Sequence, residues 1–307
     1  MALASWDVVV CVIFYSMSSS ILLILNKAAV QRIAAPSSIL FCQLAATTIF
    51  VELLARSGLA EVDAWCWDKV KPYIIVALTF ILSLFCNIRI LEHTNVDTFI
   101  TARSFTPIIV AISDVLFLQR ELPSMRSALA LFGICLGVTG YFHLDNSLNQ
   151  PAFAWILGYL SVFTFDQIFI KWICDTIPMT SWGRVLYTNA LAAVPALAWA
   201  LYFEGSVILG VVWDSTAVSV LLLSCACGIS LSFFGYRLRS LVSATSFTVV
   251  GVTCKLLSIV INTVVWDRHS SKSGLLFLIF AVLSSTFFEQ SPKREAQSEK
   301  QKVASCA

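Results

Sequence analysis

Lys255 carries a charge deep in an apolar stretch of the sequence, at the end of the segment Gly251-Val-Thr-Cys-Lys255. A charged side chain at mid-bilayer costs about 2.5–3.5 kcal/mol even on the lenient insertion scale, so its retention needs a reason. In a water-filled cavity the ammonium group would neutralise a phosphate, and Gly251 would let a ligand approach the backbone closely. The alternative is a structural ion pair with an inward-facing carboxylate such as Asp114 or Asp166.

Three other polar residues are candidates for ligand contact, each with an ordinary alternative. Arg103 lies shallower in its own apolar stretch, where it either contacts substrate or snorkels or pairs with Asp97 at a helix end. Tyr187 and Asn189 lie near the start of another stretch, where a phenol and an amide suit hydrogen bonding and stacking on a flat base. A tyrosine there is also typical of the aromatic belt at a membrane interface.

No catalytic or metal-binding constellation emerges from the sequence. The three histidines share no motif with a serine, a cysteine or a carboxylate pair, and the ten cysteines include no CxxC pair with zinc-ligand spacing. The basic residues are scattered, without the aromatic interleaving of a nucleic-acid-binding patch. We therefore expect neither an enzyme nor a protein that holds a metal, a cofactor or nucleic acid.

The composition indicates that these residues lie in a membrane protein. Of the 307 residues, 58% are hydrophobic and 12% are charged, whereas soluble domains carry about 25% charged residues. Spans of about 20 apolar residues are predicted at ten places. These are 8–25, 37–54, 73–90, 98–118, 124–142, 152–172, 185–203, 216–236, 241–265 and 274–288. The segment 61–71, with Trp65, Trp67 and several charges, is predicted to lie at the interface instead.

The distribution of Lys and Arg predicts the orientation of the chain. Most of the 20 basic residues fall on the side of the membrane where the termini lie, which places both termini in the cytosol. An even number of spans agrees with that placement. The polar tail 291–307 is predicted to be disordered.

The two halves of the sequence also resemble each other. Thr101-Ala-Arg-Ser-Phe-Thr106 and Ser243-Ala-Thr-Ser-Phe-Thr248 differ, apart from Ser/Thr exchanges, only at Arg103 against Thr245, and they lie five predicted helices apart. An odd number of helices per repeat inverts the second copy. We therefore predict an all-α protein of ten transmembrane helices in two inverted five-helix repeats, 1–145 and 146–290. The hydroxyls of Thr245, Ser246 and Thr248 either line a cavity or bond to backbone carbonyls.

Several motifs together resemble those of the plant Golgi GDP-sugar transporters, and most of all the GDP-fucose group of the nucleotide-sugar transporter family in the drug/metabolite transporter superfamily. They are Ser20–Lys27, His93–Ile100 with Arg103-Ser104, Ser243–Thr248, Gly251 with Lys255, Val260–Asn262, Trp266–His269 and Phe288–Ser291. The resemblance covers nearly the whole chain. It implies a Golgi antiporter that imports GDP-fucose or another GDP-sugar in exchange for GMP, by alternating access to a central cavity. It leaves open whether the carrier is a monomer or a homodimer.

The resemblance also implies which residues contact the nucleotide. The family carries a Phe/Leu-Tyr-Asn-Asn motif in the seventh helix and a Gly-x-x-Asn-Lys motif in the ninth. They match Leu186-Tyr-Thr-Asn189 and Gly251-Val-Thr-Cys-Lys255 in this sequence. A first-helix tyrosine and an eighth-helix serine near the nucleotide are matched by Tyr15 and Ser232.

Two positions depart from these motifs, since Thr188 and Cys254 replace asparagines. Threonine offers a base edge one shorter hydroxyl and cysteine almost nothing. An unpaired base edge in a closed cavity costs roughly 1–3 kcal/mol per group, a factor of about 5 to 150 in affinity. A carrier of a UDP-sugar or a phosphorylated sugar, or a non-transporting membrane scaffold, is therefore an alternative.

The Lys255→Ala variant is expected to lose transport, because it removes the cation assigned to the phosphate groups of the solute. Uptake into liposomes that contain the purified variant, compared with the unchanged chain, checks this expectation. Normal uptake would rule out the phosphate role.

Overall fold

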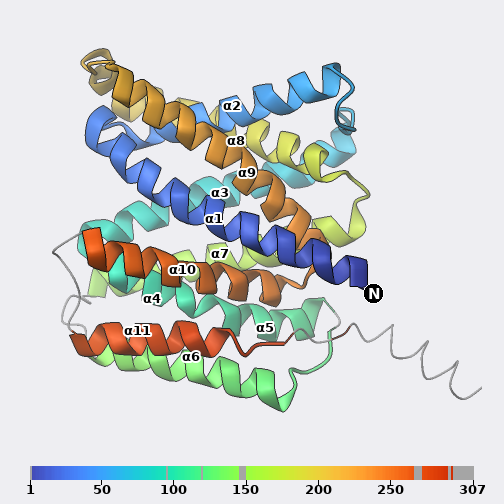
Figure 1. The fold of residues 1–307 in the computed structure, drawn as a ribbon, viewed down its shortest axis with the longest axis vertical. Helices are drawn as coiled ribbons and strands as arrows, with labels where there is room; N and C mark the ends of the chain where they lie inside the picture. Colours follow the sequence, from blue (N-terminus) through green and yellow to red (C-terminus); the bar gives the residue numbers. More distant parts are fainter. Residues whose placement is uncertain are drawn as a thin grey trace, which may run out of the picture. The chain divides into compact units, whose positions relative to one another are not determined.

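The structure is a computed structural model that describes residues 2–94, 96–118, 120–144, 150–265, 272–289 and 292. Within these ranges the side chains of residues 2–5, 88, 91–92, 96–97, 255–265 and 272 are not described. Every regular element in the described part of the chain is an α-helix (Figure 1). The helices are α1 (Ala2–Ile33), α2 (Pro36–Arg56), α3 (Trp67–His93), α4 (Val96–Ser104), α5 (Thr106–Phe117), α6 (Met125–Leu144), α7 (Gln150–Thr176), α8 (Ser181–Leu209), α9 (Ser215–Leu241), α10 (Ala244–Val265) and α11 (Lys272–Ser285).

Each of the ten predicted apolar stretches overlaps a helix, with 98–118 shared by α4 and α5 and with α1 and α3 extending several residues beyond their predicted ends. Eight helices among the described residues are long and apolar enough to cross a membrane, with α4 and α5 counted together over Thr98–Phe117. Two shorter apolar helices, Ala244–Cys254 and Ser273–Ser285, belong to α10 and α11. The prediction of an all-helical protein with many apolar helices is confirmed. The predicted tail lies outside the described residues, except for Pro292.

The stretch predicted as one span over 98–118 is divided into two helices. The first, α4, ends at Ser104, and α5 begins at Thr106. Pro107 explains the break, because proline has no N–H to give to the carbonyl four residues earlier and its ring crowds that turn. Pro195, by contrast, lies inside the continuous helix α8.

Close contacts divide the chain into two compact units, each built from both halves of the sequence. Unit 1 comprises Met1–Leu82 and Ile173–Leu241, and unit 2 comprises Ser83–Trp172 and Val242–Ala307. Unit 1 therefore holds α1, α2, α8, α9 and the first part of α3. Unit 2 holds the rest of α3, α4, α5, α6, most of α7, α10 and α11.

In unit 1, α1 and α9 lie side by side in opposite directions (Figure 1). Exposed ion pairs join them at both ends, Asp7 with Arg237 at 3.2 Å and Arg32 with Asp214 at 3.4 Å. Between these ends the hydroxyls of Ser18 and Ser230 are 2.7 Å apart, and the rings of Phe14 and Phe234 stack at 4.7 Å. Exposed pairs contribute little stability, so the apolar contacts along the helices hold this pair together.

The second helix pair of unit 1, α2 and α8, is fixed at the N-terminus of α2 by the buried carboxylate of Glu204. Its oxygens accept hydrogen bonds from the backbone N–H groups of Ser37 and Ser38, at 2.9 and 2.8 Å, and from the Ser38 hydroxyl at 2.8 Å. The first N–H groups of a helix have no partner within the helix and carry partial positive charge. Glu204, near the C-terminal end of α8, therefore supplies what the sequence around α2 lacks.

In unit 2, α6 packs closely on α11 because glycines of α6 face it. A Cβ atom added to Gly137 would lie 2.6 Å from the Ala281 Cβ and 2.7 Å from the Phe277 carbonyl oxygen. Such close backbone approach is typical of helix pairs in membranes. The other conspicuous contact of unit 2 is between α5 and α10, where the buried carboxylate of Asp114 accepts hydrogen bonds from the backbone N–H and the hydroxyl of Thr245. Asp114 thus caps α10 as Glu204 caps α2.

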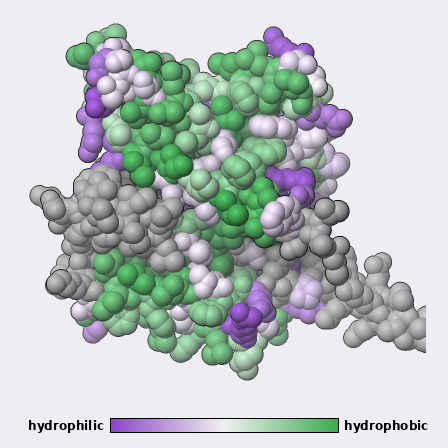
Figure 2. Space-filling model, viewed as in Figure 1, coloured by the Kyte–Doolittle hydropathy of each residue, from purple (hydrophilic) through white to green (hydrophobic). Residues whose placement is uncertain are grey.

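Large hydrophobic side chains cover much of the surface that Figure 2 shows. Exposed examples lie on most of the long helices, among them Ile13, Leu78, Phe132, Leu201 and Leu222. An exposed apolar surface of this extent suits lipid rather than water. It agrees with the membrane protein that the composition predicts.

The Glu204→Ala variant is expected to lower the free energy of unfolding by about 1–3 kcal/mol, because it leaves the N-terminus of α2 without its acceptor. Thermal unfolding in detergent measures the effect. The control is Glu52→Ala, since Glu52 forms a long, exposed ion pair with Arg56 at 3.9 Å. If both variants unfold at the same temperature, the cap does not stabilise α2.

Candidate functional site

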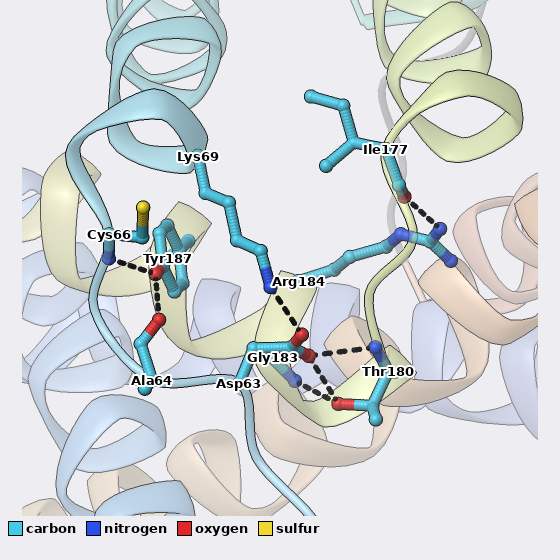
Figure 3. Close-up of polar contacts among 9 residues, drawn as sticks. All are labelled: Asp63, Ala64, Cys66, Lys69, Ile177, Thr180, Gly183, Arg184 and Tyr187. Carbon is cyan, nitrogen blue, oxygen red and sulfur yellow. Dashed lines mark hydrogen bonds and ion pairs between the residues drawn. The ribbon is translucent and has the colours of Figure 1, made fainter.

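The Leu-Tyr-Thr-Asn motif lies in the second turn of α8, and the first turn of that helix is held by Asp63 (Figure 3). The Thr180 hydroxyl accepts a hydrogen bond from the Gly183 N–H at 3.0 Å, which is the usual capping of a helix N-terminus. Asp63, in the loop after α2, accepts hydrogen bonds from the Thr180 N–H at 2.8 Å and from the Thr180 hydroxyl at 2.9 Å. The loop between α2 and α3 is therefore joined to the start of α8.

Lys69 completes this arrangement from the first turn of α3. Its ammonium group lies 2.7 Å from the Asp63 carboxylate, and both side chains are largely buried. Burial raises the pKa of Asp63, but hydrogen bonds from Lys69 and Thr180 oppose it and leave the pKa below its ordinary value. Glycine at position 183 leaves room for this carboxylate, because an added Cβ atom there would overlap the Asp63 side chain.

Tyr187 is completely buried, and in this structure its side chain holds the same loop. Its hydroxyl accepts a hydrogen bond from the Cys66 N–H at 2.9 Å and donates one to the Ala64 carbonyl at 2.6 Å (Figure 3). The Trp65 ring stacks on the Tyr187 ring at 4.4 Å. Contact between Tyr187 and a base stays a prediction, and in this conformation such a contact would compete with the loop.

Arg184 is a buried cation at the start of α8 that the sequence did not single out for a role. One of its guanidinium nitrogens donates to the carbonyls of Cys174 and Ile177, at 3.0 and 3.2 Å. Cys174 lies in the last turn of α7 and Ile177 directly follows the helix, where the last carbonyl groups have no partner within the helix. Arg184 therefore joins the end of α7 to the start of α8.

The next two motif residues face other partners. The Asn189 amide donates to the Val185 carbonyl of its own helix at 2.8 Å. The Thr188 hydroxyl lies 2.5 Å from the hydroxyl of Tyr236 in α9, and either oxygen can be the donor. No role for Tyr236 was predicted from the sequence. The sequence feature that could have indicated Tyr236 is its position four residues after Ser232, which places both residues on one face of a helix.

Tyr15 and Ser232 lie in the same unit as the α8 motif. The ring of Tyr15 in α1 approaches α9 at Gly235, where an added Cβ atom would lie 3.5 Å from the ring. Ser232 is half-buried in α9, one turn before Tyr236. Tyr15, Ser232 and the α8 motif therefore belong to unit 1, whereas Cys254, the other position where the family has an asparagine, belongs to unit 2.

The remaining predicted residues lie in unit 2, most of them on α10. The Thr248 hydroxyl donates to the Thr245 carbonyl at 2.8 Å, which is the backbone-bonding alternative for this hydroxyl. Cys254 is buried, whereas an added Cβ atom at Gly251 would meet nothing within 4 Å, so the backbone there is open to close approach. The side chain of Lys255 lies outside the described residues.

Arg103 at the end of α4 places its guanidinium group 4.7 Å from the centre of the Phe163 ring in α7. A cation over an aromatic face is stabilised by the ring quadrupole. The side chain of Asp97, the partner considered in the alternative, lies outside the described residues. Among the described residues no group of three or more His, Cys, Asp or Glu could hold a metal ion.

Two curated relatives match this chain along most of its length, although no family model matches it. GDP-fucose transporter 1 of Arabidopsis thaliana is 37% identical over 94% of this chain and 87% of its own length. GDP-mannose transporter GONST3 of the same plant is 38% identical over 90% of this chain and 76% of its own. The chain belongs to the nucleotide-sugar transporter family.

The family resemblance predicted from the motifs is thereby confirmed. Members with these names are transporters and not enzymes, as the sequence predicts for this chain. One solved crystal structure shares the fold of this nucleotide-sugar transporter, with a TM-score of 0.67 over 94% of this chain and 96% of its own, at 10% identity. That likeness shows the fold alone.

The Asp63→Asn variant is expected to lower the free energy of unfolding by about 1–2 kcal/mol, because a neutral amide cannot pair with Lys69. The contribution of a carboxyl whose folded-state pKa is depressed is fully present above its ordinary pKa of about 4 and is lost as the pH falls through the folded-state pKa. The difference in free energy of unfolding between Asp63→Asn and the unchanged chain should thus be constant between about pH 5 and 8 and shrink below about pH 4.

Thermal unfolding in detergent over this pH range measures the difference. The matched control is Asp68→Asn, because Asp68 is exposed and pairs with Lys71 at 3.7 Å near the same helix start. An effect of Asp63→Asn that equals the control, or that persists unchanged at low pH, would contradict the assignment.

Proposed function

We propose that this nucleotide-sugar transporter imports a GDP-sugar, GDP-fucose first, into the Golgi lumen in exchange for GMP. The observation that carries the proposal is the 37% identity to GDP-fucose transporter 1 across 87% of that protein. A second relative at 38% identity is named for GDP-mannose, so GDP is the part of the substrate that the two names share. An apolar all-helical chain agrees with carriage of a polar solute across a membrane.

The proposed arrangement in the membrane has ten spans in two inverted five-helix repeats with both termini in the cytosol. The match between Thr101–Thr106 and Ser243–Thr248 and the distribution of basic residues support it. The composition of the two units adds support, because each combines helices from both halves of the sequence. Alternating access would then expose the substrate site to each side in turn.

In this proposal the candidate residues have different chemical roles. Lys255 of α10 neutralises the diphosphate, and Gly251 allows the ligand to approach the backbone one turn away. Asn189 and Tyr187 of α8 meet the base. Arg103 lines or supports the luminal approach, since a guanidinium group 4.7 Å from the centre of an aromatic ring keeps its positive charge.

A carrier of a UDP-sugar is the second candidate, because Thr188 and Cys254 stand where the family motifs carry asparagine. A pyrimidine base is smaller and presents fewer hydrogen-bonding groups than guanine. The loss of two amides therefore disfavours guanine recognition more than phosphate recognition.

Liposomes that contain the purified chain should take up GDP-fucose when they are preloaded with GMP, and much less when they are empty or preloaded with UMP or CMP. The coupling of inward to outward transport gives this dependence on the preload. Uptake from a panel of GDP-, UDP- and CMP-sugars measures the base and the sugar in one experiment.

Liposomes without protein and liposomes with the Lys255→Ala variant serve as controls. Equal uptake with every preload, or no uptake at all, would rule out the exchange. A preference for UMP and UDP-sugars would replace the first candidate by the second.

A further inference from the structure

The hydrogen bond between Thr188 and Tyr236 brings a second hydroxyl to the position where the family motif has an asparagine. The two oxygens are 2.5 Å apart and belong to helices α8 and α9, 48 residues apart in the sequence. Tyr236 is buried, with the Arg239 guanidinium 5.7 Å from the centre of its ring. A buried tyrosine hydroxyl with a fixed partner is well positioned and loses little conformational freedom when it meets a ligand.

Tyr236 lies on the same side of α9 as Ser232, which is predicted to lie near the nucleotide, and Gly235. Ser232, Gly235 and Tyr236 are spaced i, i+3 and i+4, which places them on one side of the helix. The Tyr15 ring lies against this face at Gly235. Tyr236 thus lies in the same unit as Tyr15 and one helical turn after Ser232, the two residues predicted to lie near the nucleotide.

Two hydroxyls joined by one hydrogen bond can replace one amide in chemical terms. An asparagine amide offers donors at its nitrogen and an acceptor at its oxygen. Each hydroxyl has one donor and two acceptor lone pairs. The hydrogen bond between Thr188 and Tyr236 uses the donor of one hydroxyl and one lone pair of the other. Because either oxygen can donate in that bond, the pair can present a donor or an acceptor at either end.

We infer that Tyr236 is a specificity-determining residue for the nucleotide base and that, with Thr188, it takes the place of the first asparagine of the motif. This inference rests on the proposed function, because it assigns the base-reading part of the same site. A purely structural role would be to join α8 to α9. The two roles differ in what they change, since a structural bond affects all nucleotides alike.

The test is nucleotide selectivity in the Tyr236→Phe variant of the full chain, reconstituted in liposomes. We expect KM for GDP-fucose to rise roughly fivefold or more, the effect of one lost hydrogen bond to a base edge. KM for a UDP-sugar should change less, so that the ratio of the two KM values shifts. Tyr202→Phe is the matched control, because Tyr202 is 82% exposed on α8 and the same hydroxyl is removed there.

Further variants test whether Thr188 and Tyr236 act together on the base or separately. Thr188→Asn in the Tyr236→Phe background should restore KM for GDP-fucose, because one amide supplies the donor and the acceptor. Thr188→Val alone should raise KM about as much as Tyr236→Phe. The double variant should raise KM for GDP-fucose no more than either single change, because both changes break the same hydrogen-bonded pair.

Equal changes for all nucleotide sugars, or a failure of Thr188→Asn to rescue, would overturn the inference. Uptake by liposomes that contain the unchanged chain tests the proposed function separately. If they take up no GDP-sugar, the proposed function is wrong. In that event thermal stabilisation by GMP, UMP and AMP still tests the pair. If Tyr236→Phe leaves the order of stabilisation by these three nucleotides unchanged, Tyr236 does not determine base specificity.

Discussion

Side-chain carboxylates hold the N-termini of three helices, and each carboxylate comes from a distant part of the sequence. Glu204 caps α2, Asp63 holds the start of α8 and Asp114 caps α10. In apolar surroundings water cannot satisfy the first N–H groups of a helix, so an acceptor must come from the protein. The contacts of α2 and α8 are reciprocal, because Glu204, which caps α2, lies near the C-terminal end of α8, and Asp63, which binds the N-cap residue of α8, lies after the C-terminal end of α2. This reciprocity fixes how far each helix of the pair extends along its partner.

The anchored start of α8 also determines which way the motif residues face. Successive side chains on a helix point about 100° apart, so neighbours in the sequence contact different elements. Tyr187 contacts the loop after α2, whereas Thr188 contacts α9. In the proposed site, nucleotide recognition would be tied to the loop through Tyr187 and to α9 through Thr188. A ligand that competes for Tyr187 would loosen the same loop that Asp63 joins to α8.

Most of the fold could be predicted from the sequence because a membrane helix is encoded locally. The stretch 37–54 became α2 (Pro36–Arg56) and 185–203 became α8 (Ser181–Leu209), with ends that differ by a few residues. The break at Phe105 was not predicted, because composition does not reveal whether neighbouring helices satisfy the carbonyl freed by Pro107. The grouping of helices into two units could not be predicted from the sequence either, because side-chain shape over the whole chain determines which helices pack together.

By itself the sequence determined the class of protein, the family and the residue types of the candidate site, because hydropathy and motifs are properties of short segments. Only the tertiary structure showed that the Tyr187 hydroxyl joins Ala64 and Cys66, that Asp63 lies against Thr180, and that Tyr236 is the partner of Thr188. These contacts link residues 48 to 123 positions apart. Hydrogen bonds need atoms within about 3 Å, and only the packing of helices against one another brings such distant residues that close.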